Sequence, residues 1–240
     1  MTVRIAMWSG PRNLSTAMMR SFGARADTTV SDEPFYGAYL RHSGADQPMR
    51  DAVMASMECD WTAVAQALAG PAPRRIWYQK HMAHHMVGPV DPGGMPGFTH
   101  AFLIRDPARV IASYAAKRVM VTADDLGYAR QRDYFGRVAD RLGHAPPVID
   151  SADVLGDPAA VLTALCTALG IDWDPAMLTW TAGGRVTDGI WAQHWYGRVL
   201  ESTGFEPNEP PPPLLDGAAR RVRDQCHPHY AYLARYRLGV

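Results

Sequence analysis

Cysteine is scarce in this 240-residue sequence, and long apolar runs are absent. The three cysteines, Cys59, Cys166 and Cys226, are widely spaced and form no CxxC pair. The sequence therefore predicts neither a disulfide framework nor a zinc site, and it fits a reducing, cytoplasmic compartment. No stretch reaches the roughly 18 consecutive apolar residues of a membrane span. The first residues also lack the apolar segment of a signal peptide.

An excess of charge of either sign is also missing. Lys and Arg total 24, as do Asp and Glu, so the formal net charge is zero. This balance argues against a broad surface for nucleic acid or for an anionic membrane, although it allows a local basic pocket for a small polyanion. Hydrophobic residues make up 47% and charged residues 20% of the chain, which is an ordinary globular composition.

Strand-like and helix-like stretches alternate along the chain. Short apolar runs predict strands at 3–9, 28–31, 76–79, 101–104 and 148–149. Helical spacing of apolar residues, or an Asp-Pro start signal, predicts helices over 14–22 and 50–68 and helices beginning at 106–107, 157–158 and 174–175. The segments 88–97 and 206–213, rich in Gly and Pro, predict loops.

This alternation predicts a single domain over 1–240. We expect a three-layer α/β/α fold with a mainly parallel five-stranded sheet, because helices then cover both faces of the strands. Ligands of such sheets bind at the carboxyl ends of the strands. The residues that directly follow each predicted strand are therefore the candidates for function.

The loop after the first strand is one candidate anion site. It contains Gly10, Arg12, Asn13, Ser15 and Thr16, at a point where a helix N-terminus offers unpaired N–H groups. A GxxxxGK[ST] loop counted from Gly10 would need Gly and Lys where Ser15 and Thr16 stand, which disfavours a magnesium-dependent NTP hydrolase. An ordinary turn between strand and helix is the alternative interpretation.

A second candidate follows the fourth strand. Arg105 lies at the end of that strand, and Ser113 lies about two turns into the next helix. A guanidinium and a hydroxyl placed in this way can flank one oxyanion. An arginine followed by a capping aspartate is the simpler structural alternative.

Together, the stretches SGPRNLSTAMMRSF and FLIRDPARVIASY resemble the PAPS-dependent sulfotransferase family, in its bacterial form. The resemblance implies a P-loop NTPase-like sulfotransferase fold that binds PAPS (3′-phosphoadenosine-5′-phosphosulfate). It places Arg12 in the position of the family's loop lysine, with Ser15 and Thr16 as the two hydroxyl residues at the 5′-phosphosulfate end. Arg105 and Ser113 take the place of the pair that holds the 3′-phosphate.

A third stretch, 150–158, is similar to another segment of the family, although Ser151 stands where a tyrosine near adenine is common. The family's basic C-terminal segment has no evident counterpart. Arg220, Arg221 and Arg223 are candidates for it, but a solvated helix face is the preferred interpretation.

Candidates for chemistry follow the second and third strands. Glu33 precedes Pro34, which disfavours helix, so its carboxylate is expected in an extended segment. The resemblance implies that Glu33 is the catalytic base; a solvent-facing carboxylate is the alternative. Lys80 and His81 resemble the family's K-x-H with one spacing changed. This implies Lys80 as the cation for the bridging oxygen or a phosphate, and His81 as the second candidate base.

Two further clusters are weighed against simpler interpretations. His81, His84 and His85 suggest a metal site, but their spacing lacks a completing carboxylate, so no metal is expected. An aromatic stripe predicts core more than a wall of the acceptor pocket; its members are Trp191, Trp195, Tyr196 and Phe205.

The predicted function is transfer of a sulfuryl group from PAPS to a hydroxyl or amine of a small-molecule acceptor, with PAP (adenosine 3′,5′-bisphosphate) as product. No nucleic-acid partner is expected. The alternatives are a P-loop phosphotransferase that uses ATP and a non-catalytic nucleotide-binding protein of the same fold. The acceptor and the oligomeric state, a homodimer included, are left open by the sequence.

Overall fold

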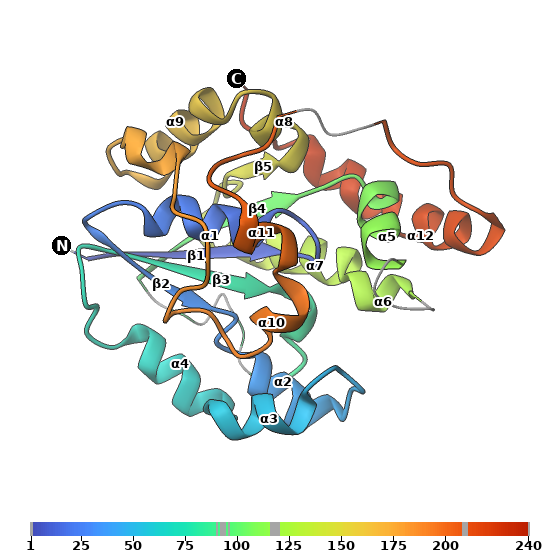
Figure 1. The fold of residues 1–240 in the computed structure, drawn as a ribbon, viewed down its shortest axis with the longest axis horizontal. Coiled ribbons are helices and arrows are strands. Elements are labelled where there is room, and N and C mark those ends of the chain that lie inside the picture. The colour runs from blue at the N-terminus through green and yellow to red at the C-terminus, as the bar shows by residue number, and fades with distance from the viewer. Residues whose placement is uncertain are drawn as a thin grey trace.

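The computed structural model describes residues 2–89, 91, 95, 97–115, 121–207 and 211–239. Figure 1 shows a central sheet flanked by helices. The strands are β1 (Val3–Ser9), β2 (Thr28–Asp32), β3 (Ile76–Met82), β4 (Phe98–Ile104) and β5 (Val148–Asp150). They pair in the order β2-β3-β1-β4-β5, and the four pairings between neighbours in this order are parallel. The predicted α/β fold with a parallel five-stranded sheet is thus confirmed.

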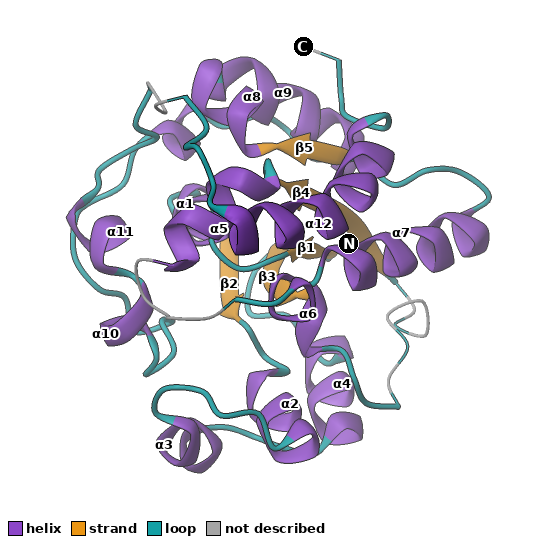
Figure 2. Cartoon of the chain, turned by 90° about the vertical axis from the view of Figure 1, so that its right-hand side faces the viewer, coloured by secondary structure: helices purple, strands orange, loops and turns teal. Residues whose placement is uncertain are grey.

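Helices cover both faces of this sheet, and Figure 2 shows α1 and α7 on opposite sides of it. The helices are α1 (Ser15–Gly23), α2 (Tyr36–Ser43), α3 (Arg50–Ser56), α4 (Trp61–Ala69), α5 (Pro107–Ala115), α6 (Ala123–Leu126), α7 (Tyr128–Leu142), α8 (Ser151–Gly156), α9 (Pro158–Leu169), α10 (Ala192–Trp195), α11 (Gly197–Glu201) and α12 (Gly217–Ala234). Two short 3₁₀ helices are η1 (Ala83–His85) and η3 (Pro175–Leu178). No helix within the described ranges has the length and apolar character that crossing a membrane requires.

The apolar side chains of β1 point alternately to the two faces of the sheet, and each set belongs to a separate part of the hydrophobic core. Ile5 and Met7 pack with residues of α1 and α9, whereas Ala6 and Trp8 pack with residues of α4, α7 and α12. Successive side chains of a strand point to opposite faces, so one continuous apolar run supplies both layers. The sheet is therefore rigidly held, and its carboxyl edge is a stable platform for a site.

Several predicted elements differ from the observed ones. The helix expected over 50–68 is two helices, because the Glu58 carboxylate accepts from the N–H groups of Cys59 and Asp60 at 2.7 and 2.8 Å. Asp60 then caps α4 by accepting from Ala63 N at 2.8 Å. The Asp174 start signal opens only the 3₁₀ turn η3. Strand β3 extends to Met82, so Lys80 and His81 lie inside the strand rather than after it.

The predicted loops fall partly outside the described residues. In the segment 88–97, residues 90, 92–94 and 96 are not described, and the described ones up to 97 belong to no helix or strand. In the proline-rich segment, residues 208–210 are not described, and 211–213 precede α12 as a loop.

A segment over 179–207, here called the roof, carries α10 and α11 across the carboxyl end of the sheet (Figure 1). A bridge between Thr179 and Gly204 closes its base. Arg20 of α1 binds Asp188 of the roof through two hydrogen bonds of 2.6 and 2.7 Å. Both side chains are buried, with 2% and 6% exposed. This ion pair anchors the roof to the sheet domain.

We expect the variant Arg20→Ala to lose about 3–5 kcal/mol of unfolding free energy, because it leaves a buried carboxylate without its partner. Urea unfolding followed by circular dichroism measures the loss. The control is Arg137→Ala, whose pair with Asp133 lies at 2.9 Å on the surface and contributes less than about 1 kcal/mol. Equal losses in the two variants would contradict the anchoring role.

Buried histidines surround Trp8 in the core. The ring of His81 stacks on Trp8 with a centroid distance of 4.4 Å, and the Trp8 indole donates to His100 Nδ1 at 3.0 Å. Burial lowers the pKa of His81 to about 3 and the pKa values of His84 and His100 to about 4. These rings are therefore neutral in the folded protein at neutral pH.

Acidification is expected to destabilise the fold between about pH 6.5 and pH 4. In that window the unfolded chain protonates its histidines near their ordinary pKa of about 6.5. In the folded protein His81, His84 and His100 stay neutral, as does His85, whose pKa burial also lowers. The unfolded state then binds up to four more protons at these rings, which amounts to at most about 5.5 kcal/mol per pH unit. Burial raises the pKa of Asp150 and of Glu33, and these groups act in the opposite sense.

Urea unfolding at pH 7, 6 and 5 measures how the free energy of unfolding depends on pH. The variant His81→Phe keeps a stacked ring and should make the pH slope shallower by up to about 1.4 kcal/mol per pH unit. Replacement of the exposed His144 by Gln serves as the control, because it removes a histidine while leaving the residues around Trp8 intact. A slope that does not change in His81→Phe would show that this ring titrates in the same way in both states.

Candidate functional site

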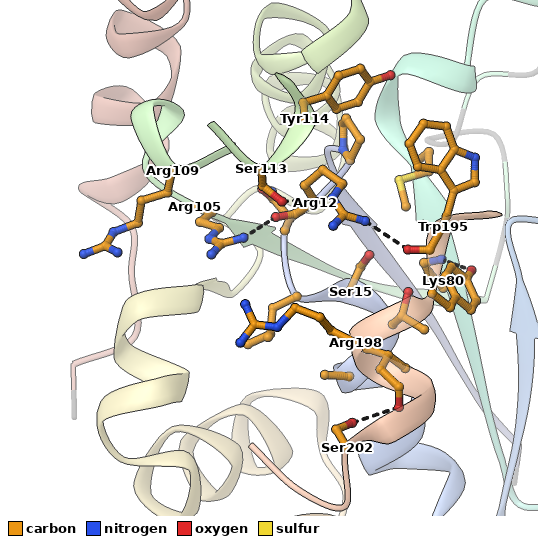
Figure 3. A pocket seen from close by; sticks show the side chains of 18 of the residues that line it. Arg12, Ser15, Lys80, Arg105, Arg109, Ser113, Tyr114, Trp195, Arg198 and Ser202 are labelled. Carbon is orange, nitrogen blue, oxygen red and sulfur yellow. Dashed lines mark hydrogen bonds between the residues drawn. The ribbon is translucent and has the colours of Figure 1, made fainter. Parts of the chain in front are cut away.

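A cavity of about 660 Å³ opens at the carboxyl edge of the sheet, beneath the roof. Its volume lies within the range of pockets for drug-sized ligands. The cavity brings together most of the residues that the sequence singled out: Arg12, Asn13, Ser15, Thr16, Glu33, Lys80, Arg105 and Ser113. Figure 3 shows several of them pointing toward one another from different elements. Gly10 and His81 do not line it.

The loop after β1 bends sharply into α1. Arg12 and Leu14 have positive φ values of 59° and 66°, a strained conformation that is frequent at functional sites. No side chain of the described residues caps α1. The first N–H groups of this helix and its positive dipole end therefore face the cavity beside the buried side chains of Ser15 and Thr16.

Two predicted residues of this region support the loop. The Asn13 carboxamide donates to the Leu103 carbonyl at 3.1 Å in the core, and Ser151 donates to the Asn13 carbonyl at 3.1 Å. A Cβ at Gly10 would lie 2.8 Å from the carbonyl oxygen of Leu126, so glycine is required there by close packing. Asn13, Ser151 and Gly10 therefore support the backbone of the loop, and the Asn13 carboxamide is directed into the core rather than toward a ligand.

Guanidinium groups gather on one side of the cavity (Figure 3). Arg12 donates to Ser113 Oγ and to the Trp195 carbonyl, both at 3.0 Å. Arg105 donates to the Arg12 carbonyl at 2.6 Å. Burial lowers the pKa of Arg12, and the nearby charges of Arg105 and Arg198 lower it further. Cations held this close repel one another, so an anion bound between them is favoured.

Sequence reasoning missed two of these cations. Arg109 of α5 and Arg198 of α11 both line the cavity. Arg109 lies four residues after Arg105, a spacing that the sequence offered as a signal. Arg198 belongs to the roof, and only the folded chain brings it here. The residues considered as a basic C-terminal segment are not in the lining; they are Arg220, Arg221 and Arg223 of α12.

Acid and base groups meet on the opposite side of the cavity. The Lys80 ammonium donates to Asp32 Oδ1 at 2.8 Å, to Glu33 Oε1 at 2.6 Å and to the hydroxyl oxygen of Tyr196 at 2.6 Å. Charged neighbours raise the pKa of Lys80 against the opposing effect of burial, so it is cationic at neutral pH. Burial raises the pKa of Glu33, while Lys80 acts to lower it.

The backbone at Glu33 is not extended as expected, since its φ is +45°. Its N–H still pairs with the Lys80 carbonyl at 2.9 Å, and its own carbonyl accepts from Tyr36 N at 2.9 Å, which closes a tight turn. The turn directs the carboxylate toward Lys80 at the edge of the sheet.

The histidines divide between core and cavity. His81 points to the face opposite Lys80, as neighbours in a strand must, and its Nε2 lies 3.2 Å from Gln79 Oε1. It therefore sits behind the cavity. His84 and His85, which follow on η1, line the cavity instead. Among the described residues no group of His, Cys, Asp or Glu side chains could hold a metal ion.

The aromatic stripe is split in the same way. Trp191 is part of a buried cluster with Tyr36 and Leu40. Trp195, Tyr196 and Phe205 line the cavity. The core interpretation thus describes Trp191. Tyr196 belongs both to that buried cluster and to the cavity wall, and Trp195 and Phe205 contribute walls.

Comparison with known proteins is consistent with this arrangement. A family model described as "Sulfotransferase domain" matches residues 3–234. Two curated Arabidopsis thaliana proteins, branched-chain-amino-acid aminotransferase-like proteins 2 and 1, are 33% and 36% identical over 95% and 84% of this chain. The chain spans only 41% and 36% of those two proteins.

A solved structure shares the fold. The sulfotransferase domain of the Synechococcus PCC 7002 olefin synthase matches with a TM-score of 0.54 at 19% identity, covering 93% of this chain and 94% of that domain. The family model extends over nearly the whole chain. The chain belongs to the sulfotransferase domain family.

Proposed function

We propose that this protein transfers a sulfuryl group from PAPS to a hydroxyl or amine of a small-molecule acceptor. The observation that carries the proposal is the gathering of Arg12, Arg105 and Arg198 beside an uncapped helix N-terminus in one cavity. Such a cluster of cations fits a ligand with several negative charges, because guanidinium groups and helix N–H groups bind phosphate and sulfate oxygens well. Membership of the sulfotransferase family supplies the reaction class.

The donor would lie along this cationic side. Arg12, Ser15 and Thr16, with the N–H groups of α1, would hold its 5′-phosphosulfate end, while Asn13 keeps the loop in shape. Arg105 and Ser113 would hold its 3′-phosphate, and Arg198 extends toward Arg105 in Figure 3, where it adds a further donor. The chemistry of this donor set fits a nucleotide that is phosphorylated at both ends.

The acceptor would lie on the other side, near Glu33 and the aromatic walls. When bound, PAPS supplies the activated sulfuryl group. Glu33 would take the proton of the attacking hydroxyl or amine, and Lys80 would supply positive charge beside the reacting oxygens. Since sulfuryl transfer resembles phosphoryl transfer, positioning and charge stabilisation account for most of the rate. The proposed reaction involves no metal.

Calorimetric titration with PAP, ADP and ATP tests the donor assignment. The wild type should bind PAP more tightly than ADP or ATP. Arg105→Ala should weaken PAP binding about 10- to 100-fold and remove the preference, because it deletes a charge-assisted contact. Arg223→Ala on α12, outside the cavity lining, is the matched control and should bind PAP as the wild type does. Equal or tighter binding of ATP would contradict the proposal and favour a kinase.

The variant Glu33→Gln tests the base. We expect the rate of PAP release from PAPS, measured with a panel of alcohols, phenols and amines, to fall by about 10²–10⁴. PAP affinity should stay within about twofold, since Gln is isosteric and Glu33 lies away from the cationic side. A variant that retains the full rate would exclude Glu33 as the base while leaving the donor assignment intact.

A further inference from the structure

Asp32, the residue before Glu33, is buried in the same cluster but has no role so far. The side chains of Asp32 and Lys80 are each 1% exposed, and that of Glu33 is 9% exposed. Two carboxylates therefore share one ammonium in a nearly dry site. Such an arrangement is costly unless each charge is compensated, so the geometry of all three groups is tightly defined.

The hydrogen bonds of Lys80 are saturated. An ammonium has three N–H groups, and the three partners are Asp32, Glu33 and Tyr196. Asp32 is in turn held independently of Glu33, because it accepts from the Tyr196 hydroxyl at 2.7 Å and from Gly189 N at 3.2 Å. Asp32 is thus fixed in place as a counter-ion of Lys80.

Among the described residues, the Glu33 carboxylate is held by a hydrogen bond to one of its two oxygens. Its Oε1 accepts from Lys80, whereas Oε2 lies 4.0 Å from His85 Nδ1, beyond hydrogen-bond range. Glu33 and His85 both line the cavity. The Oε2 oxygen is therefore available to an acceptor.

On the basis of the proposed function, we propose that Asp32 is a positioning residue: as the counter-ion of Lys80, it prevents the ammonium from fully neutralising Glu33 and keeps Oε2 able to accept a proton. If Lys80 paired with Glu33 alone, the carboxylate would be a weaker base, because an opposite charge at hydrogen-bond distance stabilises the ionised form. Asp32 offsets that effect without touching the acceptor itself.

The electrostatic environment supports this division of roles. Burial raises the pKa of Glu33, the Lys80 charge lowers it, and the Asp32 charge raises it again. Burial keeps His85 neutral by lowering its pKa, so this ring adds no competing charge. The titratable and charged groups that contact or interact with Glu33 are Asp32 on β2, Lys80 on β3, His85 on η1, Tyr36 on α2 and Tyr196 in the roof.

The test is the titration of Glu33 itself in the ligand-free protein. The sequence has five glutamates, so carbon-13 labelling of glutamate gives few side-chain signals. Comparison with Glu33→Gln identifies the signal of Glu33. Asp32→Asn should lower the pKa of Glu33 by about one unit or more, a tenfold change in its ionisation, because Lys80 then acts unopposed. Lys80→Met should raise that pKa, because two carboxylates then face each other.

Opposite shifts in Asp32→Asn and Lys80→Met would show that charge, rather than a loosened site, sets the pKa of Glu33. A loosened site that admits water would instead move the pKa of Glu33 toward the ordinary value of about 4.3 in both variants. Tyr196→Phe removes a hydrogen bond but no charge, and should shift the pKa of Glu33 less than Asp32→Asn does. An unchanged or raised pKa in Asp32→Asn overturns the inference. If that variant does not fold, a pKa that fails to rise in Lys80→Met overturns it instead.

Neither ligand nor activity enters this titration. If the opposite shifts are found but no sulfuryl transfer occurs, only the proposed function fails. If transfer occurs and depends on Glu33 but the shifts are absent, only the role of Asp32 fails. Where transfer is measurable, the acid limb of the rate profile should move to lower pH in Asp32→Asn, together with a lower maximum rate.

Discussion

The buried ammonium of Lys80 is the contact on which the arrangement of the site depends. A charge taken out of water must be compensated by partners with good geometry, and here those partners come from three separate parts of the chain. Asp32 ends β2 and Glu33 follows it directly, Lys80 belongs to β3, and Tyr196 belongs to the roof. Satisfying one cation therefore aligns two strand ends and draws the roof over the carboxyl edge of the sheet.

The other side of the cavity has the opposite character, because several arginines gather there. Of these, Arg198 pairs with Glu206 at 2.9 Å. Burial and the charges of Arg105 and Arg198 lower the pKa of Arg12, and the loop that carries Arg12 has two residues with positive φ. Such crowding and strain cost folding free energy and persist only where the surrounding structure is rigid. The parallel sheet, with apolar layers on both faces, supplies that rigidity. A bound polyanion would relieve the repulsion.

The sequence predicts those parts of the site that are formed by residues close together in the chain, and it does not predict those formed by residues far apart. Local signals located the five strands, the loop after β1 and the pair Arg105 and Ser113, because each rests on a strand followed directly by a helix. Strand alternation also implies that Lys80 and His81 cannot share a site, which adjacency alone did not reveal. The roof contacts were not predictable in this way: Lys80 and Tyr196 are 116 residues apart, and no local pattern links them.

The roof connects the two sides of the cavity, and this explains why its anchoring matters for chemistry. Its Trp195 carbonyl accepts from Arg12 on the cationic side, while the adjacent Tyr196 binds Lys80 and Asp32 on the side of Glu33. Neighbouring residues of one short helical segment thus fix both groups of charges. Asp188 and Gly189 hold the start of that segment on Arg20 and Asp32. The distance between the arginines and Glu33 is therefore set in part by contacts outside the cavity lining.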